Sequence, residues 1–258
     1  MLALDAARYG DRDLSARVSA VPVEGEPAVR WGVDWATGSD VDARFRCALT
    51  GHTGRVWAVA TGVVDGCPVA VTGSDDGTVR VWDLTTGRPV GEPLTGHTSR
   101  VLAVATGVVD GRPVAVTGSG DKTVRVWDLT TGRPVGEPLT GHTDSVRAVA
   151  TGVVDGRPVA VTGSDDRTVR VWGLTTGRGE PLTGHTDSVW AVATGVVDGR
   201  PVAVTGSADG EVRVWDLTTG RQVGPGLVFP AAVRAVAVAP DGRLVVGFGW
   251  EVSVLTRC

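Results

Sequence analysis

The chain has 258 residues and a mass of 26.6 kDa, and its 25 basic and 29 acidic side chains give a formal net charge of −4. A hydrophobic content of 42% together with this low net charge excludes a mainly disordered chain. The 37 glycines and 14 prolines recur throughout, which excludes a coiled coil or a mainly helical bundle. Because no apolar run reaches membrane-spanning length and the N-terminus does not resemble a signal peptide, we expect a cytoplasmic protein with no membrane partner.

The net charge and the cysteine content limit the kinds of partner and cofactor that we expect. An isoelectric point near 5.6 gives no global basic field, so we expect no nucleic-acid partner. Cys47, Cys67 and Cys258 are too few and too scattered for a CxxC metal site or a disulfide framework, and we expect neither a metal nor another cofactor. The chain has no isoleucine or asparagine and a single lysine, Lys122, which suggests a GC-rich, bacterial genome.

An internal repeat determines the expected architecture. Gly-His dipeptides recur at intervals of 45, 45 and 43 residues, and a tryptophan follows each of them about 30 residues later. In three copies an aspartate follows the tryptophan, whereas the third copy has Gly173. The histidines are His52, His97, His142 and His185, and the tryptophans are Trp82, Trp127, Trp172 and Trp215.

Each repeat contains the pattern of four short strands. In the second copy we expect a first strand at Val101–Val109, a hairpin turn at Asp110–Gly111 and a second strand at Val114–Thr117. A third strand is expected at Thr123–Trp127 and a fourth around Pro134–Leu139. The nearly continuous apolar strands indicate sheets that are covered on both faces.

These repeats closely resemble the WD-repeat β-propellers over about residues 49–217. The resemblance implies an all-β fold of four-stranded blades. The regular blades are expected at about residues 49–93, 94–138, 139–181 and 182–226.

Closure of the ring needs further strands from the two ends of the chain. Glu24–Pro27 matches Asp110–Pro113, which indicates an irregular blade at about residues 14–48, and a second irregular blade is expected at about 227–258. We therefore predict one domain over residues 1–258: a six-bladed ring whose first and last blades pair through their backbones. Seven blades would need about another 45 residues from a second chain or a missing portion. The strands expected in the last blade are Ala232–Ala239, Leu244–Phe248 and Trp250–Leu255.

The resemblance also implies a buried Asp-His-Thr-Trp network in every regular blade. Because the sets recur once per blade, they do not converge as catalytic groups must, and every histidine is used in them. We therefore expect no catalytic site. The four sets are Asp76, His52, Thr72 and Trp82; Asp121, His97, Thr117 and Trp127; Asp166, His142, Thr162 and Trp172; and Asp209, His185, Thr205 and Trp215.

Third-strand arginines recur at the same position in each regular copy. We expect their stems to pack and their charges to point outward. They are Arg80, Arg125, Arg170 and Arg213.

The nearly identical copies differ mainly beside two short turns, which in the family open on one face of the ring. Family members commonly contact partners through the positions three and five residues after the Gly-His histidine. Arginine and tryptophan are typical of interface hot spots, although Asp75 and Asp165 neutralise part of the positive field here. The predicted partner-binding residues are Arg55, Trp57, Arg100, Leu102, Arg147, Trp190 and Arg234.

The function favoured by these observations is a non-enzymatic interaction scaffold that binds a peptide or protein on this face. One alternative is a structural module that closes its ring with another chain. Another is an enzyme that uses the central channel, since fold alone does not determine function.

Overall fold

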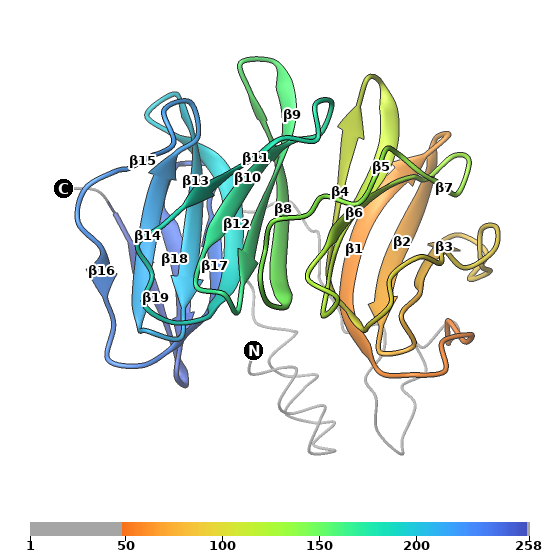
Figure 1. Cartoon of the computed structure of the whole chain (residues 1–258), viewed down its shortest axis with the longest axis horizontal. Helices are drawn as coiled ribbons and strands as arrows, with labels where there is room; N and C mark the ends of the chain where they lie inside the picture. The colour runs from red at the N-terminus through yellow and green to blue at the C-terminus, as the bar shows by residue number, and fades with distance from the viewer. Residues whose placement is uncertain (1–47, 257–258) are drawn as a thin grey trace, which may run out of the picture. The chain divides into compact units, whose positions relative to one another are not determined.

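The computed structural model describes residues 48–256, which form antiparallel sheets joined by short turns, with no helix in this range (Figure 1). The fold is all-β, as predicted, and strands consecutive in sequence pair within each sheet, except that β16 pairs with β14. The second and third sheets have four strands, the first and last have three, and the fourth has five. The first three sheets contain β1 (Val56–Val64), β2 (Cys67–Ser74) and β3 (Val79–Asp83); β4 (Val101–Val109), β5 (Arg112–Ser119), β6 (Val124–Asp128) and β7 (Arg133–Pro134); and β8 (Val146–Val154), β9 (Arg157–Ser164), β10 (Val169–Gly173) and β11 (Gly179–Leu182). The last two contain β12 (Val189–Val197), β13 (Arg200–Ser207), β14 (Glu211–Asp216), β15 (Arg221–Gln222) and β16 (Leu227–Val228); and β17 (Val233–Val238), β18 (Leu244–Phe248) and β19 (Glu251–Leu255).

Turn chemistry sets the strand boundaries inside each repeat. The first strand of the second repeat, β4, has the predicted bounds, and the turn after it places Asp110 at φ 49° and Gly111 at φ 76°. Two successive positive φ values define the hairpin turn whose twist matches that of the flanking strands. The outermost strand is interrupted after Pro134 by a turn in which Gly136 adopts φ 71°, and the pairing resumes at Leu139, whose N–H donates to the carbonyl of Val124 at 2.8 Å.

Neighbouring sheets pack through a repeated contact between a valine and a glycine. We call the valine the knob and the glycine the socket. An added Cβ on any of the four sockets would lie 2.4 to 2.6 Å from a Cγ1 of the valine, so only glycine leaves room for it. All four of these knob valines are 0% exposed. The socket and knob pairs are Gly73 with Val101, Gly118 with Val146, Gly163 with Val189, and Gly206 with Val233.

A ladder of threonine hydrogen bonds joins the first strands of successive sheets. The hydroxyl of Thr106 donates to the carbonyl of Thr61 at 2.6 Å. Thr151 donates in the same way to Thr106 at 2.7 Å, and Thr194 donates to Thr151 at 2.6 Å. These bonds fix the register between sheets that the valine contacts hold together.

The irregular C-terminal unit forms a sheet of its own, β17 to β19, at nearly the predicted positions. Thr50–Cys258 is a compact unit. The irregular blade expected at residues 14–48 lies almost wholly outside the described residues, so the six-bladed ring, its β pairing and the single domain stay predictions. Within residues 48–256 the chain forms no helix that is long and apolar enough to cross a membrane.

Candidate interaction face

A hydrogen-bonded network braces each regular sheet from within. In the second repeat, the two ring nitrogens of His97 lie 2.8 Å from Asp121 Oδ2 and 2.8 Å from Thr117 Oγ1. The indole N–H of Trp127 donates to the same threonine oxygen at 2.9 Å. A proton on His97 Nδ1 satisfies the carboxylate and leaves Nε2 to accept the threonine hydroxyl proton, so every polar atom of the set has a partner.

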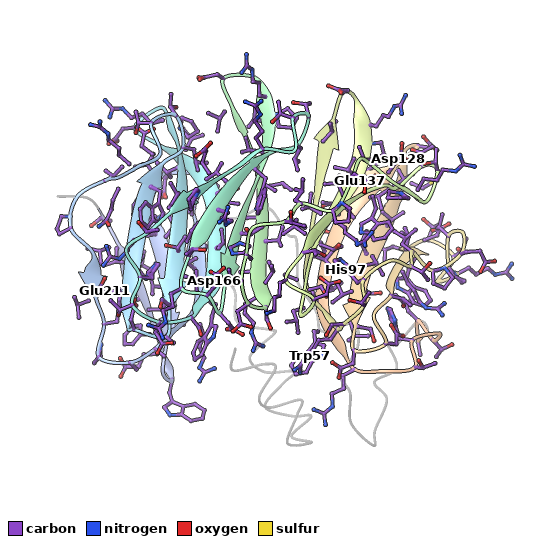
Figure 2. All side chains as sticks on the ribbon, viewed as in Figure 1. Trp57, His97, Asp128, Glu137, Asp166 and Glu211 are labelled. Carbon is purple, nitrogen blue, oxygen red and sulfur yellow. The ribbon has the colours of Figure 1, made fainter. Side chains whose placement is uncertain are left out.

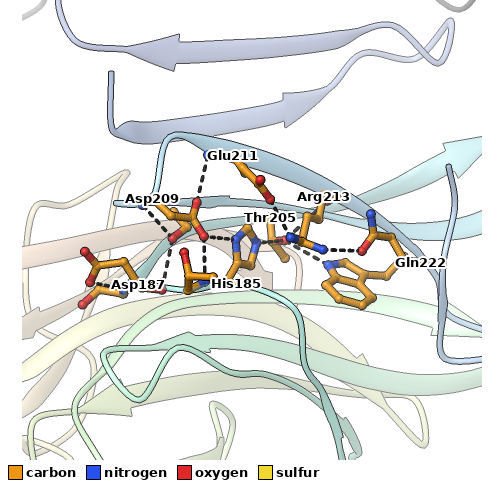
Figure 3. Close-up of polar contacts among 11 residues, drawn as sticks. His185, Asp187, Thr205, Asp209, Glu211, Arg213 and Gln222 are labelled. Carbon is orange, nitrogen blue, oxygen red and sulfur yellow. Dashed lines mark hydrogen bonds and ion pairs between the residues drawn. The ribbon is translucent and has the colours of Figure 1, made fainter. Parts of the chain in front are cut away.

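The other three regular sheets repeat this geometry (Figure 3 shows the fourth). That copy has Glu211 where the others have a threonine, and Glu211 and Gln222 accept hydrogen bonds from Arg213 at 2.6 Å each. The tryptophans of the networks are 1 to 3% exposed. The remaining histidine–aspartate and histidine–threonine distances are 2.9 and 2.8 Å at His52, 2.8 and 2.8 Å at His142, and 3.0 and 2.8 Å at His185.

Burial and hydrogen bonding shift the pKa values in these networks. Burial alone would raise the pKa of Asp121, but hydrogen bonds from His97, Thr123 and the Thr98 N–H outweigh it and hold that pKa well below its usual range. Burial lowers the pKa of His185 below its ordinary value, and the hydrogen bond to Asp209 offsets this only in part. Asp121 is therefore held in its ionised form, and the neutral form of His185 is favoured.

The four histidine sets lie in four different sheets and do not gather at one point. Among residues 48–256, no three histidine, cysteine, aspartate or glutamate side chains are placed to hold a metal ion.

The third-strand arginines lie differently from the prediction. The Nε of Arg80 is buried and has no hydrogen-bond partner among the described residues, and its Nη1 would lie 2.8 Å from a Cβ added to Gly51. The guanidinium thus lies over the Gly-His backbone instead of pointing outward. Arg125, Arg170 and Arg213 repeat this contact at Gly96, Gly141 and Gly184.

Backbone hydrogen bonds join the Gly-His loop to the turn after the second strand. In the first repeat the N–H of Asp75 donates to the carbonyl of Arg55 at 2.8 Å. A Cβ added to Gly77 would lie 3.5 Å from the carbonyl oxygen of Ser99, so this turn adjoins the loop of the next repeat. We call the edge built in this way the loop face; it consists of residues 53–57 and 75–78, 98–102 and 120–123, 143–147 and 165–168, 186–190 and 208–211, and 230–234.

In the first and third repeats, the side chain five residues after the histidine contacts the first residue of this turn. The indole N–H of Trp57 donates to Asp75 Oδ1 at 2.5 Å, and the tryptophan remains 48% exposed (Figure 2). In the third repeat, Arg147 Nε donates to Asp165 Oδ2 at 2.7 Å. Both aspartates are therefore partly committed to partners within their own repeat.

The other predicted contact residues divide into three kinds. The guanidinium carbon of Arg234 lies 4.8 Å from the centre of the Trp190 ring, a cation–π contact between two sheets. Leu102 is a correction to the prediction, because at 9% exposure its side chain packs in the core and offers little surface to a partner. Arg55 and Arg100 are exposed, and no described residue forms an ion pair with either of them.

Two exposed aspartates on the loop face were missed by the sequence reasoning. Asp144 and Asp187 stand two residues after their histidines and accept hydrogen bonds from the next backbone N–H, at Ser145 and Ser188, at 2.7 Å each. The first and second repeats have Gly54 and a serine there. A comparison of the third and fourth copies with the first two would have found this change of charge along the face.

Four consecutive antiparallel sheets, each braced by one Asp-His-Thr-Trp network and packed on the next sheet, define a repeat protein built of propeller-type blades. The family described as "WD domain, G-beta repeat" matches residues 44–83, 87–128, 132–173 and 179–216, well over half of the sequence. The chain belongs to this family. It is also similar to the ribosome biogenesis protein ERB1 of Chaetomium thermophilum, with 61% identity over 41 residues; this segment is 16% of the chain and 5% of that protein.

Proposed function

We propose that the chain is a non-catalytic interaction module that binds a peptide or protein through its loop face. WD repeats typically mediate protein–protein interactions, and this chain carries four of them. All four histidines are engaged inside the sheets, which leaves none on the loop face as a general base.

The observation that carries the proposal is the exposed group formed by Arg55, Trp57 and Arg100. The repeats are nearly identical elsewhere, but here they present arginines that no described residue neutralises, beside a tryptophan that is 48% exposed. Arginine and tryptophan supply large contact areas and directional donors, and both are enriched among the residues that dominate binding energy.

The charges on the loop face favour an acidic segment in the partner, located over the first two repeats. Arg147 is neutralised by Asp165, and Arg234 stacks on Trp190. Arg55 and Arg100 remain available for bidentate hydrogen bonds to carboxylates. Asp144 and Asp187 would repel an acidic segment from the third and fourth repeats, so charge sets the orientation of the partner.

The test is affinity capture from a lysate of the source cells, with an Arg55→Ala/Arg100→Ala variant compared with the unmodified chain. The matched control is Arg157→Ala/Arg200→Ala, which removes two exposed arginines at the hairpin ends of their sheets, away from the loop face. We expect a protein that is captured by the unmodified chain and the control, is lost with the loop-face variant, and is released by salt. Identical captured proteins from all three folded chains would contradict the proposal.

A further inference from the structure

The first sheet exposes the valine face that every later sheet buries. Val56 is 52% exposed and Val59 is 65% exposed. Val56 holds the position of the four buried knob valines, because it pairs with Ser74 as Val101 pairs with Ser119, with the same register shift after it. The β1 face is therefore a knob without a socket among the described residues.

The last sheet has a glycine in the socket position on which no described valine packs. Gly247 pairs with Ala235 as Gly206 pairs with Ala191, so it holds the socket position. A Cβ added to Gly247 would meet only Ala235, at 3.4 Å and beyond, whereas one added to Gly206 would lie 2.4 Å from Val233. No described valine enters the Gly247 socket.

Apolar surface surrounds this open socket. Val252 pairs with Gly247, so the two residues lie on the same side of the sheet, and Val252 is 53% exposed. Its counterpart beside the filled Gly206 socket is Val212, which is 0% exposed. The burial of Val212 indicates that a further sheet packed on the Gly247 socket would also cover Val252.

The threonine ladder is also open at both ends. Thr61 stands where Thr106, Thr151 and Thr194 donate to a preceding sheet, but its hydroxyl meets no acceptor among residues 48–256. Val238 pairs with Leu244 as Thr194 pairs with Ala203, so its carbonyl holds the position of the acceptors. The β1 face thus carries a hydroxyl donor, that of Thr61, and the last sheet carries the matching carbonyl acceptor, that of Val238.

We propose that two copies of the chain associate end to end, with Val56 and Val59 of one copy packed on the Gly247 socket of the other. Three features match at once: the knob with the socket, the exposed valines with one another, and the Thr61 hydroxyl with the Val238 carbonyl. A second copy carries every one of these groups in the spacing that the internal contacts use. Such a contact joins different surfaces, so it continues into a ring where the rotation closes and into an open chain where it does not. It lies on the sheet faces and does not depend on the loop-face proposal.

The test measures the mass of the full chain by light scattering over a wide range of concentrations. We expect mass to rise with concentration for the unmodified chain. Gly247→Ala should weaken association by at least about tenfold, because its Cβ is tolerated beside Ala235 but would clash with an inserted valine. Val56→Arg should do the same, while the control Val228→Arg, at a residue that is 77% exposed on β16, should behave as the unmodified chain.

Mixing the two variants distinguishes this contact from nonspecific association. Val56→Arg keeps an intact socket and Gly247→Ala keeps an intact knob, so an equimolar mixture should form a dimer that grows no further. A monomer at every concentration, or oligomers that persist in both variants, would overturn the proposal. A Val56→Arg chain that melts lower than the unmodified chain at dilutions where both are monomers would also overturn it, because the β1 face would then be covered within its own chain.

Discussion

Replacement of His97 by alanine tests whether the repeated networks brace the sheets. The side chain is 0% exposed and contacts Asp121 and Thr117 at 2.8 Å each. Its loss leaves both groups with other partners: Thr117 still accepts from the Trp127 indole, and Asp121 keeps the N–H and hydroxyl of its neighbouring threonine, Thr123. Two buried hydrogen bonds at about 1 kcal/mol each and a small cavity give an expected loss of about 3 kcal/mol of unfolding free energy.

Urea unfolding followed by tryptophan fluorescence measures this loss. Thr117→Val removes the hydroxyl while keeping the side-chain shape, and it should also destabilise the chain. Because both substitutions break the same His97–Thr117 hydrogen bond, the double variant should lose less than the sum of the two single losses. A loss below about 0.5 kcal/mol for His97→Ala, or strict additivity of the pair, would refute the bracing role.

Two further predictions concern the turn chemistry and the pH response. Asp128 accepts hydrogen bonds from the N–H groups of the two residues after Leu129, whereas the equivalent Gly173 has no side chain to do so. Gly173→Asp should therefore raise the melting temperature by about 1 to 3 °C relative to Gly173→Ala, as measured by calorimetry. An equal or lower melting temperature for Gly173→Asp would contradict this reasoning. Because the pKa of His185 is lowered by folding, the unfolded chain binds protons more readily, so the free energy of unfolding should be highest above about pH 6.5 and fall as the pH drops through that value. The lowered pKa of Asp121 should cause a second loss of stability below about pH 4. Melting temperatures that stay constant or rise from about pH 7 to about pH 3 would contradict these signs.

Local structure was predictable because each strand is bounded by residues with strong turn preferences. Val101–Val109 has its predicted bounds since Asp110 and Gly111 adopt the positive φ values that such a hairpin needs. The equivalent Gly-His, threonine and tryptophan positions could be aligned from the repeat alone.

Contacts between sheets were not predictable from one repeat. Gly73 reads as a strand glycine in the sequence, and only the packed structure shows that Val101 fills the space above it. Leu102 was misjudged for the same reason, because its exposure depends on the surrounding packing more than on its place in the loop. Arg80 was misplaced because its long side chain reaches the Gly-His backbone twenty-nine residues earlier in the chain.

The sameness of the four sockets has a consequence for how the molecule is assembled. Val146 packed on Gly73 would make the contact that Val101 makes there. This contact therefore does not distinguish the sheet that normally packs on β2 from the sheet that follows it in sequence. A polypeptide emerging from the ribosome offers its sheets one at a time, and each then meets its correct neighbour first. The order of synthesis thus supplies the information that repetition has removed from the interfaces.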